Sequence, residues 1–435
     1  MSSIAIVLLG FAFLFLLVFL RMPFGFAFIF SGFTGLVLLK GLNTSLAALG
    51  AIPYSSVAIY VMVALPLFIL MGQFAYNSGI SKELFDAAYK SVGRAPGGIA
   101  LATNLACTAF AACTGSSLAS AATMGVIALP ELKKRNYDLK LATGCIAAGG
   151  TLGVLIPPST MFIIYGFLTE QSIGRLFIAG MFPGILLSGL FSIWILVSCI
   201  RNPKLGPPGP AFPMRETLSS IKGIWGMVGL FFLIIGGLYF GIFTPSEAGG
   251  IGAFGAFALG VLRRRLDWRA FVISLRETTI NTCFILILLV GVTLFNAFLV
   301  HAGFTQLLQD WVDSLQLSRY LVLVVILLIY LPMGMFMDTL AMLLLTTPIF
   351  FPIITSLGFD PIWYGVIMVI IIEAALITPP VGMNCFVLSK VDPDIPLSLI
   401  FRGIAPYFVL MMVCVAILII FPQIALFLPN LMMKG

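Results

Sequence analysis

The chain has 435 residues, of which 61% are hydrophobic and only 9% are charged, and its mean hydropathy is +1.15. A soluble protein of this length needs more charge to cover its surface, so the composition excludes a soluble enzyme and predicts an all-α protein that crosses a lipid bilayer many times. The formal charge of +7 would suit a nucleic-acid partner, but the distribution of the basic residues described below argues against one.

Ligands for a metal cofactor are scarce. His301 is the only histidine, and the seven cysteines stand singly in apolar runs with no CxxC pair. Zinc, haem and iron–sulfur sites therefore lack their usual ligands, and we expect no cofactor.

The apolar runs predict membrane-spanning helices of roughly 20 residues. The first run follows Met-Ser-Ser without the basic start or the cleavage site of a signal peptide, so we expect it to be retained. The predicted full crossings are 4–20, 22–40, 56–77, 138–168, 176–200, 225–243, 246–262, 278–300, 363–389 and 398–421.

Two further apolar stretches, 97–131 and 321–354, are interrupted midway by polar residues. Each could form two short crossings or one re-entrant hairpin. If both stretches form re-entrant hairpins, 19 of the 23 basic residues fall on one side of the membrane. The positive-inside rule identifies this side as cytoplasmic. Both termini are then periplasmic. The four basic residues on the outer side are Lys40, Arg175, Arg319 and Lys434.

The two halves of the chain share one spacing. Ser116 precedes Pro157-Pro158 by 41 residues, and Asp338 precedes Pro379-Pro380 by the same number. Chance alignment of common membrane-helix prolines is the simpler alternative, but further landmarks occur in the same order. We therefore predict two inverted-topology repeats, residues 1–200 and 224–429, each with five crossings and one hairpin, joined by a cytoplasmic connector at 201–223.

A Pro-Pro pair removes two backbone donors and frees carbonyl groups one turn earlier. In lipid those groups would lack partners, so both broken helices should line an interior cavity near the midplane. If each hairpin tip meets the break of its own repeat, two oxygen-rich pockets suited to Na⁺ result. The predicted cation ligands are Gly115, Ser116, Ser117, Gly153 and Ile156 in the first pocket, and Asp338, Thr339, Ala375 and Thr378 in the second.

These residues also have simpler roles available. Serine and threonine in membrane helices commonly bond their own backbone, and Asp338 could instead structure its hairpin tip. Glu373, inside a predicted span, could bind a proton or pair with a polar neighbour. Glu247 is most simply a partner of the helix dipole, and His301 is expected at the membrane interface.

The helix N-termini that follow the hairpin tips and the Pro-Pro breaks should favour an anionic substrate between the two pockets. We expect contacts with the substrate from Thr114, Pro157, Pro158, Ser159, Pro379, Pro380 and Asn384.

Several motifs carry a family resemblance. The runs GRAPGGIALATNLACTAFAACTGSSLASAATMG, TLGVLIPPS, SIGRLFIAGMFPGILL, GIFTPSEAG, MGMFMDTLAMLLLTTPIFFPI and LITPPVGMNCFV resemble the large, DctM-like membrane subunit of tripartite ATP-independent periplasmic (TRAP) transporters. The similarity runs from about Arg21 to Pro429. It implies the ion-transporter-superfamily fold, with ions bound at Gly115-Ser116-Ser117, at Asp338-Thr339 and before both Pro-Pro pairs. Glu373 departs from the resemblance, since a neutral residue is expected there.

The resemblance also implies sodium-coupled uptake of a small organic anion across a bacterial or archaeal inner membrane by an elevator movement. A periplasmic substrate-binding protein and a separate small four-helix membrane subunit would be its partners. We expect the two hairpins and the two broken spans to move against a scaffold formed by the other helices. The sequence does not indicate which anion is carried.

Three alternatives remain. A stand-alone sodium–carboxylate symporter would share the architecture but need no binding protein. An intramembrane aspartyl hydrolase would need a second carboxylate beside Asp338, for which Glu373 is the evident candidate. A channel is also conceivable, but no ring-forming filter motif is present.

Overall fold

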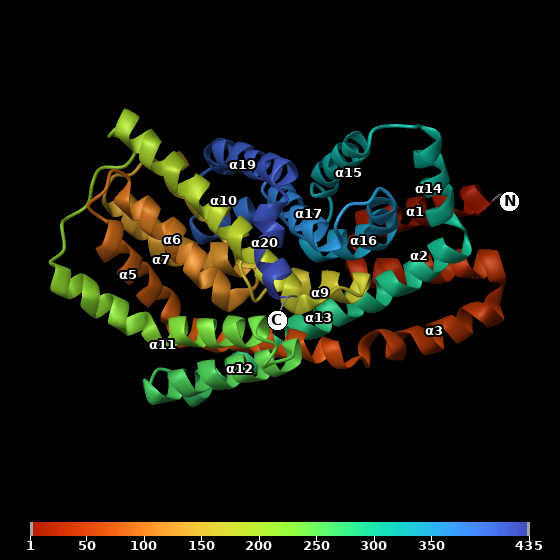
Figure 1. The fold of residues 1–435 in the computed structure, drawn as a ribbon, viewed down its shortest axis with the longest axis horizontal. Helices are drawn as coiled ribbons and strands as arrows, with labels where there is room; N and C mark the ends of the chain where they lie inside the picture. The colour runs from red at the N-terminus through yellow and green to blue at the C-terminus, as the bar shows by residue number, and fades with distance from the viewer. Residues whose placement is uncertain (1–2, 433–435) are drawn as a thin grey trace.

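The computed structural model describes residues 3–432, and within this range the chain is helical and contains no β-strand (Figure 1). The helices before the central connector are α1 (Ser3–Phe19), α2 (Phe24–Lys40), α3 (Leu42–Val57), α4 (Ala64–Asn77), α5 (Ile80–Val92), α6 (Gly98–Thr114), α7 (Ser117–Lys134), α8 (Leu139–Thr151), α9 (Thr160–Thr169) and α10 (Ile173–Arg201). The helices after it are α11 (Met214–Tyr239), α12 (Pro245–Leu262), α13 (Trp268–His301), α14 (Phe304–Ser314), α15 (Arg319–Met333), α16 (Thr339–Ser356), α17 (Pro361–Leu376), α18 (Met383–Val391), α19 (Leu397–Ile420) and α20 (Gln423–Met432).

The prediction of an all-helical membrane protein is confirmed. In residues 3–432, six helical segments are long and apolar enough to cross a membrane, and five of them fall on predicted crossings. The sixth is α16, an arm of the second predicted hairpin. The six are Tyr60–Asn77, Ile173–Arg201, Met214–Tyr239, Trp268–His301, Thr339–Ser356 and Leu397–Ile420.

Both interrupted stretches form two helices joined by a short turn. In the first stretch, α6 ends where Gly115 adopts a left-handed conformation (φ +56°), which lacks a steric penalty only for glycine. Ser116 is extended and caps α7. In the second stretch, α15 ends just after Pro332, and α16 starts after its cap, Asp338. The residues that end one helix and cap the next therefore determine the position of both tips.

Both predicted breaks interrupt their helices. After α8 the chain makes a 3₁₀ turn, Leu152–Val154, and regains helix only at Thr160. After α17, the helix resumes at Met383. The Pro-Pro peptide bond within each interruption is cis. Proline cannot donate to the helical ladder, so the helix cannot continue through either pair.

Several helices had no counterpart in the predicted crossings, namely α3, α5, α14 and α20. The helices α5 and α14 each begin after a left-handed glycine, Gly79 or Gly303. They are short and have one polar face, so a search for 20 apolar residues misses them. The third predicted crossing also starts later than expected, since α3 continues to Val57 and the next helical turn begins at Tyr60.

The central connector is shorter than predicted, because helix α11 already begins at Met214. The connector is tied to neighbouring loops through its backbone. The Gly97 amide donates to the Gly206 carbonyl oxygen (2.9 Å), and the Asp138 amide donates to that of Leu205 (2.9 Å). The Gly209 amide donates to the Gly93 carbonyl oxygen (2.8 Å). The connector thus packs against the loops that flank the first hairpin.

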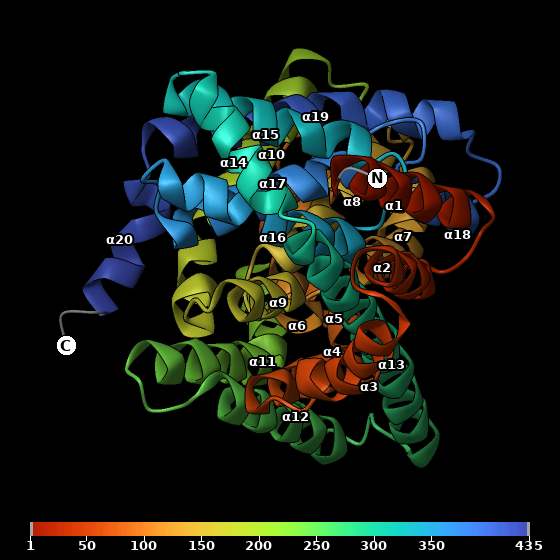
Figure 2. The ribbon, with the colours of Figure 1, turned by 90° about the vertical axis from the view of Figure 1, so that its right-hand side faces the viewer.

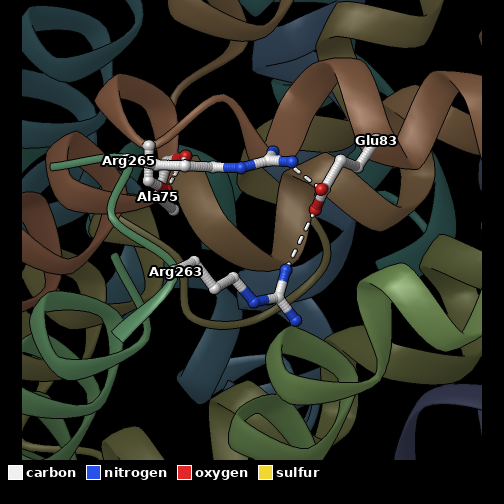
Figure 3. A network of polar contacts seen from close by, with 5 residues as sticks. Ala75, Glu83, Arg263 and Arg265 are labelled. Atoms are coloured by element: carbon white, nitrogen blue, oxygen red, sulfur yellow. Dashed lines mark hydrogen bonds and ion pairs between the residues drawn. The ribbon is translucent and has the colours of Figure 1, made fainter. Parts of the chain in front are cut away.

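An ion cluster holds α5 to the end of α12. Glu83 of α5 accepts hydrogen bonds from Arg263 (3.0 Å) and Arg265 (2.7 Å), one at each carboxylate oxygen. Figure 3 shows both guanidinium groups converging on this carboxylate. A second ion pair, Lys133 with Asp392, joins the ends of α7 and α18.

The helices can be described as two groups, which contact each other through α4 with α6 and through α13 with α16. In the first group, α2 packs on α13, α12 packs on α4, and α4 packs on α13. In the second group, α8 contacts α6, α7 and α19, while α17 contacts α15, α16 and α19. In both views α11, α12 and α3 lie along one side of the molecule, with α15 and α19 on the opposite side (Figures 1 and 2). The hairpins and the broken helices belong to the second group.

Candidate functional site

The first hairpin tip is built by Gly115 and Ser116. The Ser116 side chain accepts a hydrogen bond from the Ala119 amide (3.4 Å), so it acts as the N-cap of α7. Its hydroxyl therefore bonds its own helix, which is the simpler role considered from the sequence. The Ser116 carbonyl oxygen also belongs to this helix, since it accepts a hydrogen bond from the Ser120 amide (3.1 Å).

That carbonyl oxygen lies against the first break. A Cβ atom added to Gly153 would be 2.7 Å from the Ser116 carbonyl oxygen and 2.8 Å from the Ser120 hydroxyl. The Thr160 hydroxyl, beyond the break, donates to the Gly115 carbonyl oxygen (2.9 Å). The structure thus brings together Gly115, Ser116 and Gly153.

Ser120 and Thr160 also place hydroxyl groups at this tip, and neither residue was identified from the sequence. Ser120 and Thr114 are hydrogen-bonded through their hydroxyl groups (2.8 Å), and Ser120 is fully buried. Ser120 lies one helical turn beyond Ser116, so helical periodicity could have identified it. The contact of Thr160 with Gly115 crosses 45 positions and has no sequence signal.

The remaining predicted residues of the first break are buried. Ile156 is 7% exposed, and Pro157, Pro158 and Ser159 are also buried. The Ser159 hydroxyl accepts a hydrogen bond from the Phe162 amide (3.3 Å) and so caps α9. In this conformation these substrate-contact candidates are covered, and Thr114 is half-buried.

The second hairpin tip repeats the cap with a carboxylate. Oδ1 of Asp338 accepts hydrogen bonds from the amides of Leu340 (2.8 Å) and Ala341 (2.9 Å). Asp338 and its neighbour Thr339 are half-buried. A carboxylate at a helix N-terminus is favoured by the helix dipole and adds a full negative charge to the tip.

This tip also touches its break, but through another residue. A Cβ atom on Gly334 would clash with Ala375, four residues before the Pro-Pro pair. The Thr378 hydroxyl donates to the Ala374 carbonyl oxygen (2.7 Å), which leaves its oxygen lone pairs available. Gly334, rather than Asp338 or Thr339, therefore makes the contact, and it was not predicted from the sequence.

The two breaks differ in exposure. Pro379 and Pro380 are exposed, whereas Pro157 and Pro158 are buried. Asn384, the last predicted substrate contact, is fully buried, and its amide donates to the Ala147 carbonyl oxygen of α8 (3.1 Å). Among the predicted substrate contacts, only Pro379 and Pro380 are exposed in this conformation.

Ser117 lies apart from the Gly153 contact. Its hydroxyl donates to Oε1 of Glu373 on α17 (3.3 Å), a residue of the other half of the chain. Ser117 was predicted to serve the first cation pocket, and the structure directs its side chain to Glu373 instead. The tip oxygens that face Gly153 are those of Ser116 and Ser120.

Known proteins resemble this chain over most of its length. The family model described as the DctM component of tripartite ATP-independent periplasmic transporters matches residues 11–424. The C4-dicarboxylate TRAP transporter large permease protein DctM of Pseudomonas aeruginosa is 39% identical over 373 residues, covering 85% of this chain and 86% of that protein. The sialic acid TRAP transporter large permease protein SiaM of Vibrio cholerae is 32% identical over 419 residues, covering 95% and 96%.

A further relative, the isethionate TRAP transporter permease protein DctMQ of Oleidesulfovibrio alaskensis, is 32% identical over 86% of this chain and 59% of its own length. Among solved structures, the YdaH transporter of Alcanivorax borkumensis matches with a TM-score of 0.63 at 15% identity, covering 90% of this chain and 91% of that one. This last similarity concerns the fold alone.

Proposed function

This chain belongs to the DctM family of TRAP transporters, and we propose that it is the large membrane subunit of a sodium-coupled importer of a small organic anion. Membership makes it a multi-pass transport protein, as its relatives are named permeases. The observation that best supports ion coupling is the contact of the Ser116 carbonyl oxygen with Gly153, because it gathers backbone and hydroxyl oxygens at an interrupted helix.

The inverted repeat is supported by equivalent contacts in the two halves. The second arm of each hairpin packs on the half-helix that follows the other break, α7 on α18 and α16 on α9. Likewise, α2 packs on α13 as α12 packs on α4. A pseudo-two-fold axis that exchanges the halves accounts for both pairs of contacts. Five crossings per repeat place the second half upside down, with both termini periplasmic.

The moving unit includes α10 and α19 in addition to the hairpins and the broken helices. The amide of Asn104 on α6 donates to the Ser188 carbonyl oxygen (2.9 Å) and the Ser192 hydroxyl (2.8 Å) of α10. The Trp363 indole on α17 donates to the Leu418 carbonyl oxygen of α19 (2.8 Å). Bonds of this kind between helices favour movement as one body, and the first helix group is the scaffold.

Two cation positions fit the oxygens of the tips. The first combines the Ser116 carbonyl oxygen with the hydroxyls of Ser120 and Thr114 beside Gly153. For the second we propose the Asp338 carboxylate together with the Thr378 hydroxyl and the carbonyl groups around Ala375, the residue that Gly334 of the same tip contacts. Hard cations such as Na⁺ prefer oxygen ligands, and unwound carbonyl groups at helix ends suit them.

The substrate is a small organic anion, such as a carboxylate, a sugar acid or a sulfonate. Named relatives act on C4-dicarboxylates, sialic acid and isethionate, all of which are anions. The N-termini of α7, α9, α16 and α18 follow the two tips and the two breaks, where their dipoles attract negative charge. A periplasmic binding protein delivers the anion, and a small four-helix subunit in the same inner membrane supports the scaffold.

Reconstituted uptake tests this proposal. The large and small subunits are placed in liposomes with an outward-facing binding protein, a sodium gradient and a controlled membrane potential. Two Na⁺ carried with a monoanion bring one net positive charge into the liposome. The membrane potential contributes about 2.3 kcal/mol per 100 mV to this movement, so an inside-negative potential accelerates uptake. Uptake without sodium in the absence of a pH gradient would refute sodium coupling. Uptake without the binding protein would instead identify a stand-alone symporter.

A further inference from the structure

A buried carboxylate joins the two halves of the molecule. Glu373 on α17 is 1% exposed, and its Oε1 atom accepts a hydrogen bond from the Ser117 hydroxyl at the start of α7 (3.3 Å). Its second oxygen, Oε2, is buried and has no hydrogen-bond partner. A single neutral donor is the only polar contact of this group within residues 3–432.

A carboxylate in such a position needs compensation. Removing an unpaired carboxylate from water costs many kcal/mol, so buried charges are paired, bound to a cation or neutralised. The ion pairs of the described residues involve the bases Lys133, Arg263 and Arg265, and none of them reaches Glu373. Residues 3–432 therefore supply no ion pair to this carboxylate.

A second unpartnered oxygen lies in the same region. Asn384 on α18 is fully buried, its amide nitrogen bonds the Ala147 carbonyl oxygen of α8, and its Oδ1 atom has no partner. Ser117 contacts the same helix, since a Cβ atom on Gly150 would lie 3.0 Å from the Ser117 carbonyl oxygen. Ala147 and Gly150 are three residues apart and so share one face of α8. Asn384 and Ser117 therefore approach the same turn of α8, and Ser117 in turn holds Glu373 through its hydroxyl group.

We propose that Glu373, with the Ser117 hydroxyl and the Asn384 amide oxygen, binds one Na⁺ in addition to those at the two hairpin tips. The inference rests on the proposed sodium coupling. All three donors are oxygens, the ligand type that hard cations prefer. One carboxylate balances one monovalent charge, whereas a divalent ion would leave a net positive charge buried.

The site would connect elements of both halves. Ser117 begins the second arm of the first hairpin, while Glu373 and Asn384 lie before and after the second break. A cation held by all three ties the first hairpin to the second broken helix. Occupation of this position thus stabilises the packing of the two halves against each other.

Equilibrium binding of ²²Na⁺ to the full chain with its small subunit in nanodiscs tests the site, without any measurement of transport. We expect Glu373→Gln, which keeps the shape of the side chain, to bind one Na⁺ fewer per large subunit than the unmodified chain. We expect Glu373→Asp to retain the ion with affinity weakened about tenfold. Glu170→Gln is the matched control, because Glu170 is an exposed carboxylate at the end of α9. It should bind as many ions as the unmodified chain.

Ser117→Ala is a second variant that leaves the helix cap intact, because the cap of α7 is Ser116. It should weaken the binding of one ion about tenfold without changing the others. The inference is wrong if Glu373→Gln and Ser117→Ala both bind sodium as the unmodified chain does, since the carboxyl group is then uncharged in the folded protein. If the unmodified chain itself binds no sodium, the proposed coupling fails as well, so the two failures are distinguishable.

Discussion

Ser116 and Asp338 occupy the same structural position in the two helical hairpins, because each is the N-cap of its hairpin's second helix. Ser116 accepts one amide hydrogen bond (3.4 Å), whereas Oδ1 of Asp338 accepts two (2.8 and 2.9 Å). The capping role is shared, and the charge is not. A carboxylate at one tip and a hydroxyl at the other therefore give the two proposed cation positions unlike affinities.

Substitutions at Asp338 should separate capping from charge. Asparagine caps a helix about as well as aspartate, so Asp338→Asn should leave the melting temperature nearly unchanged while weakening the sodium dependence of uptake about tenfold or more. Asp338→Ala also loses the cap, at a further cost of about 1 kcal/mol. The measurements are thermal unfolding in detergent and uptake as a function of sodium concentration. Unaltered sodium dependence in Asp338→Asn would limit this residue to capping.

Gly153 should not tolerate even a methyl group. In Gly153→Ala the new Cβ atom meets the Ser116 carbonyl oxygen at 2.7 Å, so the tip and the break must separate, at a cost of about 1–3 kcal/mol. We expect sodium-dependent uptake to fall strongly, while the variant is expressed in the same amount as the unmodified chain. Gly189→Ala in α10 is the control, since nothing lies within 4 Å of its Cβ position. Equal uptake by the two variants would show that the tip does not need this close contact.

The Glu83 cluster predicts a stability effect that depends on salt. Glu83 is 21% exposed and Arg265 is 45% exposed, so solvent screens the pair and Glu83→Gln should cost only about 1 kcal/mol. At about 1 M choline chloride the Debye length is about 3 Å, so the difference from the unmodified chain should shrink. Thermal unfolding at low and high salt measures it. A difference that persists at high salt would indicate packing rather than charge.

The sequence predicted those features that depend on local chemistry. The hairpin tips and the breaks follow from glycine, proline and capping residues, and each was placed within a few residues of its observed position. The contact of Ser117 with Glu373 joins residues 256 positions apart and has no local signal. Gly334 was missed for the same reason, because its importance comes from Ala375 in another helix. The amphipathic helices α5 and α14 were not predicted, because the spans were identified from continuous apolar runs.

Movement of the hairpins against the scaffold should depend on Gly72. This glycine of α4 lies where the scaffold touches the first tip, since a Cβ atom there would be 2.6 Å from the Cys113 carbonyl oxygen. In Gly72→Ala the added methyl group meets the backbone of the tip. Backbone cannot move aside as a flexible side chain can. The methyl group therefore obstructs sliding of the tip past α4 and destabilises the close contact by about 1–3 kcal/mol. We expect uptake to slow while equilibrium binding of ²²Na⁺ stays normal, because the three atoms nearest the new methyl group are backbone atoms of Cys113 and Thr114, and none of them is a proposed cation ligand. Gly50→Ala in α3, with no atom within 4 Å of its Cβ position, should leave both unchanged. Loss of sodium binding in Gly72→Ala would instead mean that α4 shapes the tip itself, and normal uptake would mean that this contact does not slide during transport.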